Sequence, residues 1–66
     1  MDHTYGYMEV TGSSAESSDQ AVRNAVAAAA EKVSTIRWFE VIQTRGHVVD
    51  QAVAHWQVTV KIGYTL

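Results

Sequence analysis

The chain has 66 residues and no cysteine, so disulfides and thiolate metal ligands are excluded and a single domain, residues 1–66, is expected. Five basic and seven acidic residues give a formal charge of −2, which argues against nucleic-acid binding because such binders present a basic stripe. A core of this size is marginal on its own, so oligomerisation is the predicted source of further stability.

The N-terminal segment MDHTYGYMEV predicts a strand and no targeting signal. It lacks the basic and apolar regions of a signal peptide, and no later run approaches the roughly 20 apolar residues of a membrane span. We therefore expect a cytoplasmic protein without a membrane partner. Alternation of β-prone residues from Tyr5 to Thr11 predicts a strand that ends at Gly12.

A helix is predicted from Ser18 to about Val33, after the serine-rich connector SSAESSDQ. Ser17 and Gln20 have the spacing of a capping box, in which two side chains satisfy free backbone amides. A coiled-coil seam is an alternative for so alanine-rich a helix, but the segment holds only about two heptads. The apolar stripe expected to face a sheet consists of Val22, Val26, Ala29 and Val33.

The remainder of the chain, Ile36 to Leu66, predicts a long hairpin that turns at Asp50 and Gln51. In its second strand the even-numbered residues are almost all apolar and the odd-numbered ones are polar. A register slip by one residue would bury every polar side chain, so the even set should face the helix. This set consists of Ala54, Trp56, Val58, Val60, Ile62, Tyr64 and Leu66.

A two-residue turn pairs Val49 with Ala52 and so predicts every other pair of a regular hairpin. The helix side should then contain the pairs Phe39 with Ile62, Val41 with Val60, Gln43 with Val58 and Arg45 with Trp56. The opposite side should contain Trp38 with Gly63, Glu40 with Lys61, Ile42 with Thr59 and Thr44 with Gln57. Glu40 and Lys61 carry opposite charges, and such a cross-strand pair supports this register.

Trp38 is therefore expected on the face away from the helix, where Gly63 leaves its ring uncovered. A large indole in this position leaves roughly 150–250 Å² of surface to be buried elsewhere. From the residues alone, either a subunit contact or a flat ligand could cover it. Gln57 is expected on the same surface, either as a solvated side chain or as a hydrogen-bonding partner of such a ligand.

The stretches WFEV, RGHVVD and AVAHWQVTVKIGYTL, after a strand, a serine-rich turn and an alanine-rich helix, resemble the dodecin family over nearly the whole chain. The resemblance implies an α+β fold, in which a β-α-β-β subunit wraps a three-stranded antiparallel sheet around one helix and assembles as a hollow homo-dodecamer. It also implies a non-catalytic flavoprotein that stores FMN, or riboflavin and related flavins, and quenches their photochemistry. Some members of the family also bind coenzyme A.

The same resemblance implies three cofactor-binding residues. Trp38 matches the tryptophan that stacks on the flavin, Gln57 matches the glutamine that hydrogen-bonds the flavin ring, and Arg45 matches an arginine associated with FMN binding. A carboxamide offers both a donor and an acceptor to the ring edge, and a guanidinium can bind phosphate through two parallel hydrogen bonds. The expected position of Arg45 on the helix side conflicts with this role.

Other functions remain open on the residues alone. Trp38 could merely seal an interface of a structural oligomer, or the protein could carry coenzyme A with incidental flavin binding. A flavin-dependent reductase is disfavoured because a ring sandwiched between aromatic side chains leaves no room for a substrate. Enzyme chemistry is not indicated, and no metal site is predicted because His3, His47 and His55 lack helical ligand spacing.

Overall fold

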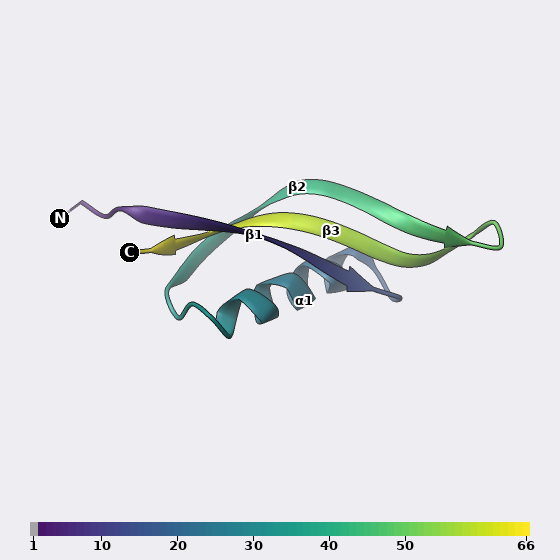
Figure 1. Ribbon diagram of the computed structural model, residues 1–66, viewed down its shortest axis with the longest axis horizontal. Helices are drawn as coiled ribbons and strands as arrows, with labels where there is room; N and C mark the ends of the chain where they lie inside the picture. Colours follow the sequence, from purple (N-terminus) through teal and green to yellow (C-terminus); the bar gives the residue numbers. More distant parts are fainter. Residues whose placement is uncertain (1) are drawn as a thin grey trace.

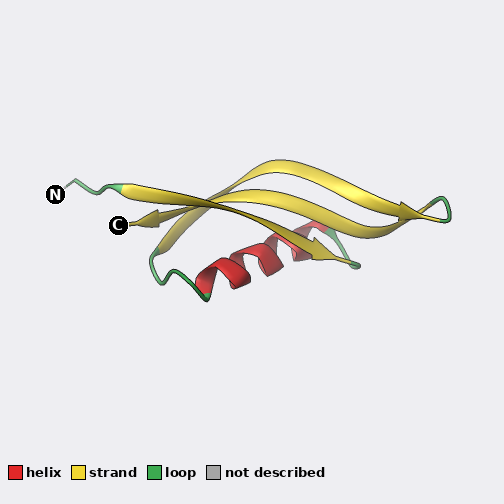
Figure 2. Cartoon of the chain, in the orientation of Figure 1, coloured by secondary structure: helices red, strands yellow, loops and turns green. Residues whose placement is uncertain are grey.

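The computed structural model describes residues 2–66 and contains three strands and one helix. In chain order these are β1 (Tyr5–Ser14), α1 (Ser18–Ala30), β2 (Ile36–Val49) and β3 (Ala52–Thr65). The strands form one antiparallel sheet in the order β1-β3-β2, and α1 lies along one face of it (Figure 1 and Figure 2). The predicted β-α-β-β subunit is confirmed.

The molecule is elongated, with extents of 53 × 19 × 13 Å, because β2 and β3 continue past the helix as a two-stranded hairpin (Figure 1). The helix packs mainly on β1 and β3 and touches β2 little. The hairpin turns where predicted, at Asp50 and Gln51, whose φ values of 53° and 66° match the two positive φ values of a type I′ turn. Within residues 2–66, no other element covers the part of the hairpin that extends past the helix.

The core joins one face of the helix to the middle of β3. Val58, Val60 and Ile62 are buried, which confirms the predicted helix-facing set at its centre. The predicted helix stripe is correct only at Ala29, because the other fully buried helix residues are Ala21 and Ala25, and Val22 and Val26 are only partly buried.

Close approach of the helix to β1 explains why alanines are buried in place of valines. A Cβ atom at Gly12 would overlap the carbonyl oxygen of Ala21 and would lie 2.8 Å from the backbone nitrogen of Ala25. Only a glycine on the strand and alanines on the helix allow the two backbones to come so near. Gly12 therefore lies inside β1, which continues to Ser14, and the prediction that it ends the strand is wrong.

Both ends of the helix depart somewhat from the sequence prediction. The Ser17 hydroxyl accepts a hydrogen bond from the Gln20 backbone N–H at 3.0 Å, as a helix N-cap does. The Gln20 side chain, however, donates to Asn24 at 3.0 Å, so only half of the predicted capping box is present. The helix ends at Ala30, three residues before the predicted Val33, where the chain tightens into a turn.

The hairpin register agrees with the prediction from Trp38 to Val41 and next to the turn, and it differs between these two parts and before Trp38, where a further shift pairs Ile36 with Tyr64. The confirmed pairs are Trp38 with Gly63, Phe39 with Ile62, Glu40 with Lys61, Val41 with Val60 and Val49 with Ala52. Register shifts interrupt the ladder between Val41 and Gln43 and again between His47 and Val48. Between these two points every residue of β2 opposes a different partner from the one predicted.

The residue responsible for the shift between Val41 and Gln43 is Ile42, which has no partner on β3. One extra residue in a strand is a β-bulge, and it moves the following side chains to the other face of the sheet. Four predicted pairs are therefore wrong. Ile42 does not oppose Thr59, and the observed pairs are Gln43 with Thr59, Thr44 with Val58 and Arg45 with Gln57.

Candidate functional site

Trp38 lies flat over Gly63 on the face of the sheet away from α1. A Cβ atom at Gly63 would overlap the Cε2 and Cζ2 atoms of the indole, so only glycine permits this contact. The rings of Tyr5 and Tyr7 stand at 71° and 86° to the indole, with centroid distances of 5.0 and 6.3 Å. Edge-to-face packing of this kind holds the indole in place. Trp38 nevertheless remains 37% exposed, which leaves it accessible on the outer face.

The contact between Gly63 and Trp38 leads to a first prediction. Gly63→Ala should lift the indole off the strand and lower the free energy of unfolding by about 1–3 kcal/mol, the usual cost of overpacking. The displaced ring should show a red-shifted tryptophan emission, measured in a Trp56→Phe background so that only Trp38 reports. An unchanged spectrum and an unchanged unfolding midpoint would contradict the close contact.

Arg45 and Gln57 form a second feature, a polar one, on the outer face of the sheet, which is the face away from α1. The bulge at Ile42 places them opposite each other, and the Arg45 Nε donates a hydrogen bond to the Gln57 Oε1 at 3.0 Å. Arg45 therefore lies on the same face as Trp38, and its predicted position on the helix side, opposite Trp56, is wrong. Within residues 2–66 no other hydrogen bond engages these two side chains, so the Arg45 Nη groups and the Gln57 amide remain for a ligand.

The two features are far apart in one chain. Gln57 precedes Gly63, the partner of Trp38, by six residues on β3, which corresponds to about 20 Å along an extended strand. Between them, Thr11 and Thr59 share a hydrogen bond of 2.8 Å, and the Lys61 ammonium lies 4.8 Å from the centroid of the Tyr7 ring. One chain therefore offers the aromatic platform and the Arg45–Gln57 pair as two separate halves of a site.

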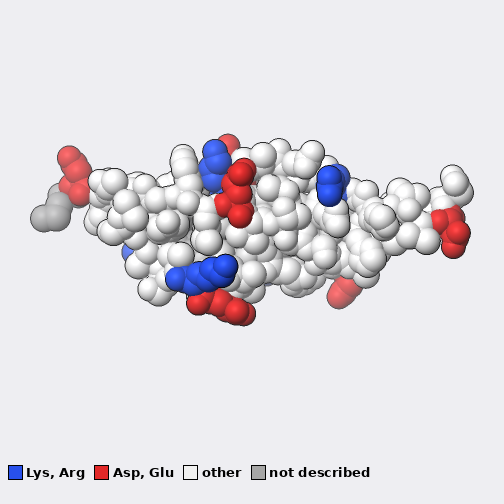
Figure 3. Space-filling model, viewed as in Figure 1, with Lys and Arg blue, Asp and Glu red and all other residues white. Residues whose placement is uncertain are grey.

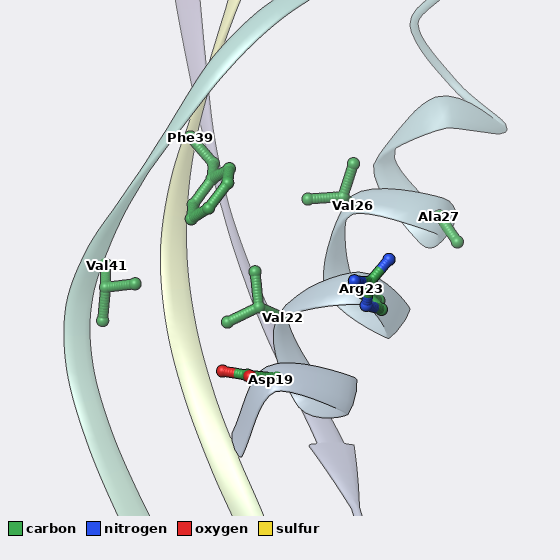
Figure 4. A pocket seen from close by; sticks show the side chains of 7 residues that line it. All are labelled: Asp19, Val22, Arg23, Val26, Ala27, Phe39 and Val41. Carbon is green, nitrogen blue, oxygen red and sulfur yellow. The ribbon is translucent and has the colours of Figure 1, made fainter. Parts of the chain in front are cut away.

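An open groove lies on the other face, between α1 and β2 (Figure 4). Its volume is about 650 Å³, and Val22 and Val26 of the helix face Phe39 and Val41 of β2 across it. Phe39 and Val41 are 50% and 47% exposed. Their predicted helix-facing orientation is correct, but the narrow helix does not cover them. None of the three predicted site residues lines this groove.

Charge does not gather into a patch on the face seen in Figure 3, where acidic and basic side chains are interspersed. Among residues 2–66, no three His, Cys, Asp or Glu side chains are grouped so as to hold a metal ion. No helix in this part of the chain is long and apolar enough to cross a membrane.

Comparison with known proteins decides the family. The dodecin family model matches residues 4–66. This chain belongs to the dodecin family. A curated dodecin from Thermus thermophilus is 32% identical over 66 residues, covering 100% of this chain and 96% of that protein.

Solved dodecin structures have the same fold. The dodecin from Streptomyces davaonensis superposes with a TM-score of 0.95 at 42% identity, covering 100% of this chain and 97% of that chain. The dodecin from Streptomyces coelicolor gives a TM-score of 0.93 at 51% identity, covering 98% and 93%. The dodecin fold extends over essentially the whole of this chain.

Proposed function

We propose that this dodecin binds FMN without catalysing a reaction, and that it stores the flavin and quenches its photochemistry within a homo-oligomer. The observation that carries the proposal is the exposed indole of Trp38, fixed over Gly63 and flanked by Tyr5 and Tyr7 on the sheet face away from the helix. A flat tricyclic ring is the kind of ligand that such a platform stacks best. A stacked indole is also a ready electron donor to a photoexcited flavin, and return of the electron then restores both partners.

Self-association is part of the proposal because one chain does not assemble the site. The separation of about 20 Å between the Trp38 platform and the Arg45–Gln57 pair exceeds the length of a flavin ring system. A copy that stacks the ring through Trp38 therefore needs a neighbour to supply Gln57. Exposed apolar side chains on the hairpin, including Val48 at 60% and Val53 at 54%, also favour burial against another copy.

Within this site Gln57 and Arg45 have different tasks. The Gln57 amide lies next to the guanidinium and can donate to a carbonyl of the flavin ring. The Arg45 Nη groups extend the same row of donors and suit a phosphate, to which guanidinium binds through charge-assisted hydrogen bonds. This arrangement favours phosphorylated FMN over riboflavin.

The phosphate role predicts a selective loss in Arg45→Ala. FMN affinity should fall about tenfold or more, since a hydrogen bond to a charged group contributes about 1.5–3 kcal/mol, and riboflavin affinity should change little. Equilibrium dialysis of both flavins against the variant and the unmodified protein measures the difference. If the two affinities fall equally, Arg45 acts on the ring, through Gln57, and has no phosphate role.

A direct test of the oligomeric part is the mass in solution. Light scattering after size exclusion should give a mass many times that of one chain, both with and without FMN. A monomer would overturn a site that needs a second copy.

A further inference from the structure

Two histidines face each other across the hairpin, next to the Arg45–Gln57 pair and toward the turn. His47 on β2 opposes His55 on β3, and their rings have a centroid distance of 6.2 Å and an interplanar angle of 42°. Both side chains are exposed. We propose that this pair binds a divalent transition-metal cation of the zinc and copper class, with one imidazole nitrogen from each strand.

Two bulges, at Ile42 in β2 and at Ala54 in β3, create the pair. In a regular hairpin that pairs Val49 with Ala52, His47 would oppose Ala54 and would lie on the opposite face of the sheet from His55. The extra residue at Ile42 shifts the register by one, and the shift is undone only between His47 and Val48. The two imidazoles therefore share a face solely within this shifted segment.

The His47 and His55 rings could bind one ion after a small rotation of their side chains. Zinc binds histidine nitrogen at about 2.0–2.1 Å, so two imidazoles on one ion have ring centroids about 4.5–5.5 Å apart. The observed 6.2 Å is about 1 Å longer. Opposed residues of antiparallel strands have Cβ atoms about 4.5–5.5 Å apart, so rotation of two exposed side chains is sufficient and the backbone need not move.

The surroundings define what kind of site this is. Imidazole suits zinc, copper and nickel better than calcium or magnesium, which prefer oxygen ligands. No third His, Cys, Asp or Glu joins the pair within residues 2–66, so water completes the coordination and the ion exchanges freely. The charged neighbours along the hairpin are Arg45, which is tied to Gln57, and Asp50 in the turn. Ligands must be deprotonated, so the affinity should fall as the pH falls.

The test uses the full chain, stripped of metal with a chelator, and Zn²⁺ alone as the probe. Titration calorimetry should show binding to the unmodified protein, and His47→Gln and His55→Gln should each weaken it at least tenfold. The third histidine supplies the matched control, because His3→Gln removes one imidazole outside the pair and should leave the affinity unchanged. Circular dichroism confirms that each exposed substitution leaves the fold intact.

Electron paramagnetic resonance of the Cu²⁺-loaded His3→Gln protein distinguishes a shared ion from two separate ones; His3 is removed because its imidazole and the backbone amides before it can chelate Cu²⁺ themselves. The His3→Gln protein should show two coordinating imidazole nitrogens, and adding His47→Gln or His55→Gln should leave one at most. A single coordinating nitrogen in the His3→Gln protein would overturn the proposal. The same conclusion would follow if His3→Gln weakened binding as much as the variants of the pair, or if His47→Gln retained full affinity.

Discussion

Gly12→Ala should lower the free energy of unfolding by about 3 kcal/mol or more, which is most of the stability of so small a domain. The added methyl group would overlap the Ala21 carbonyl oxygen and would lie 2.8 Å from the backbone nitrogen of Ala25 and 2.9 Å from its Cβ. The obstructing atoms belong largely to the helix backbone, so no side-chain rotation relieves the overlap. The helix would have to move off β1 and would open the core that it forms with β3.

Gly46→Ala is the matched control for this prediction. A Cβ atom there would lie 3.3 Å from the carbonyl oxygen of His55 and 3.7 Å from a methyl carbon of Val53, so the same substitution should cost less than about 1 kcal/mol. Urea unfolding followed by circular dichroism, at one protein concentration because assembly adds stability, compares the two variants. Equal unfolding midpoints would show that the close approach of helix and strand does not govern stability.

Trp38→Ala should weaken FMN binding by at least about 30-fold. Removing a large aromatic anchor from a binding site commonly costs about 2 kcal/mol or more. The other tryptophan is the control, since Trp56 is partly buried on the helix side, and Trp56→Phe should bind FMN as the unmodified protein does. FMN affinity measured by equilibrium dialysis makes the comparison.

The same variant separates flavin stacking from a purely structural role for the indole. If Trp38 stacks on FMN, Trp38→Ala should retain the mass of the assembly in light scattering while FMN binding is lost. If the assembly dissociates instead, the indole seals an interface, and the alternative of a structural oligomer is favoured. Retained FMN affinity in an intact assembly would contradict the stacking role outright.

The alternation of β3 was sufficient to predict the faces of the sheet and the position of Trp38. Val58, Val60 and Ile62 are buried as expected, and Trp38 lies over Gly63 on the outer face. This part of the prediction succeeded because the last strand alternates cleanly and because the confirmed pairs near Trp38 precede the bulge at Ile42. Side-chain parity within one strand reports faces reliably wherever one face is buried.

The alternation of side chains along β2 predicts the wrong face for the residues that follow the extra residue, Ile42. Ile42 is an ordinary β-branched residue and is not a glycine that would mark a bulge, so the sequence around it reads as regular strand. The regular register therefore predicts Arg45 on the helix side and does not predict that His47 and His55 face each other. The conflict between the predicted side of Arg45 and its implied role beside Gln57 is the one sign in the sequence of an irregularity in β2.

The predicted buried face of the helix is largely wrong for a different reason. A stripe of valines is the more hydrophobic face, and ordinary amphipathic reasoning buries it. The face that is buried is instead the one with the smallest side chains, because close contact with Gly12 and β1 excludes larger ones. Val22 and Val26 are left to line the groove opposite Phe39. Backbone proximity of this kind depends on the glycine of another element, which a helical periodicity does not report.

The most direct test of the proposed function is the fluorescence of FMN titrated with the purified protein. If the flavin stacks on Trp38, its emission should fall steeply and reach a low plateau at saturation, and Trp38→Ala should remove the effect. Full flavin emission at saturating protein would contradict the proposed binding and quenching.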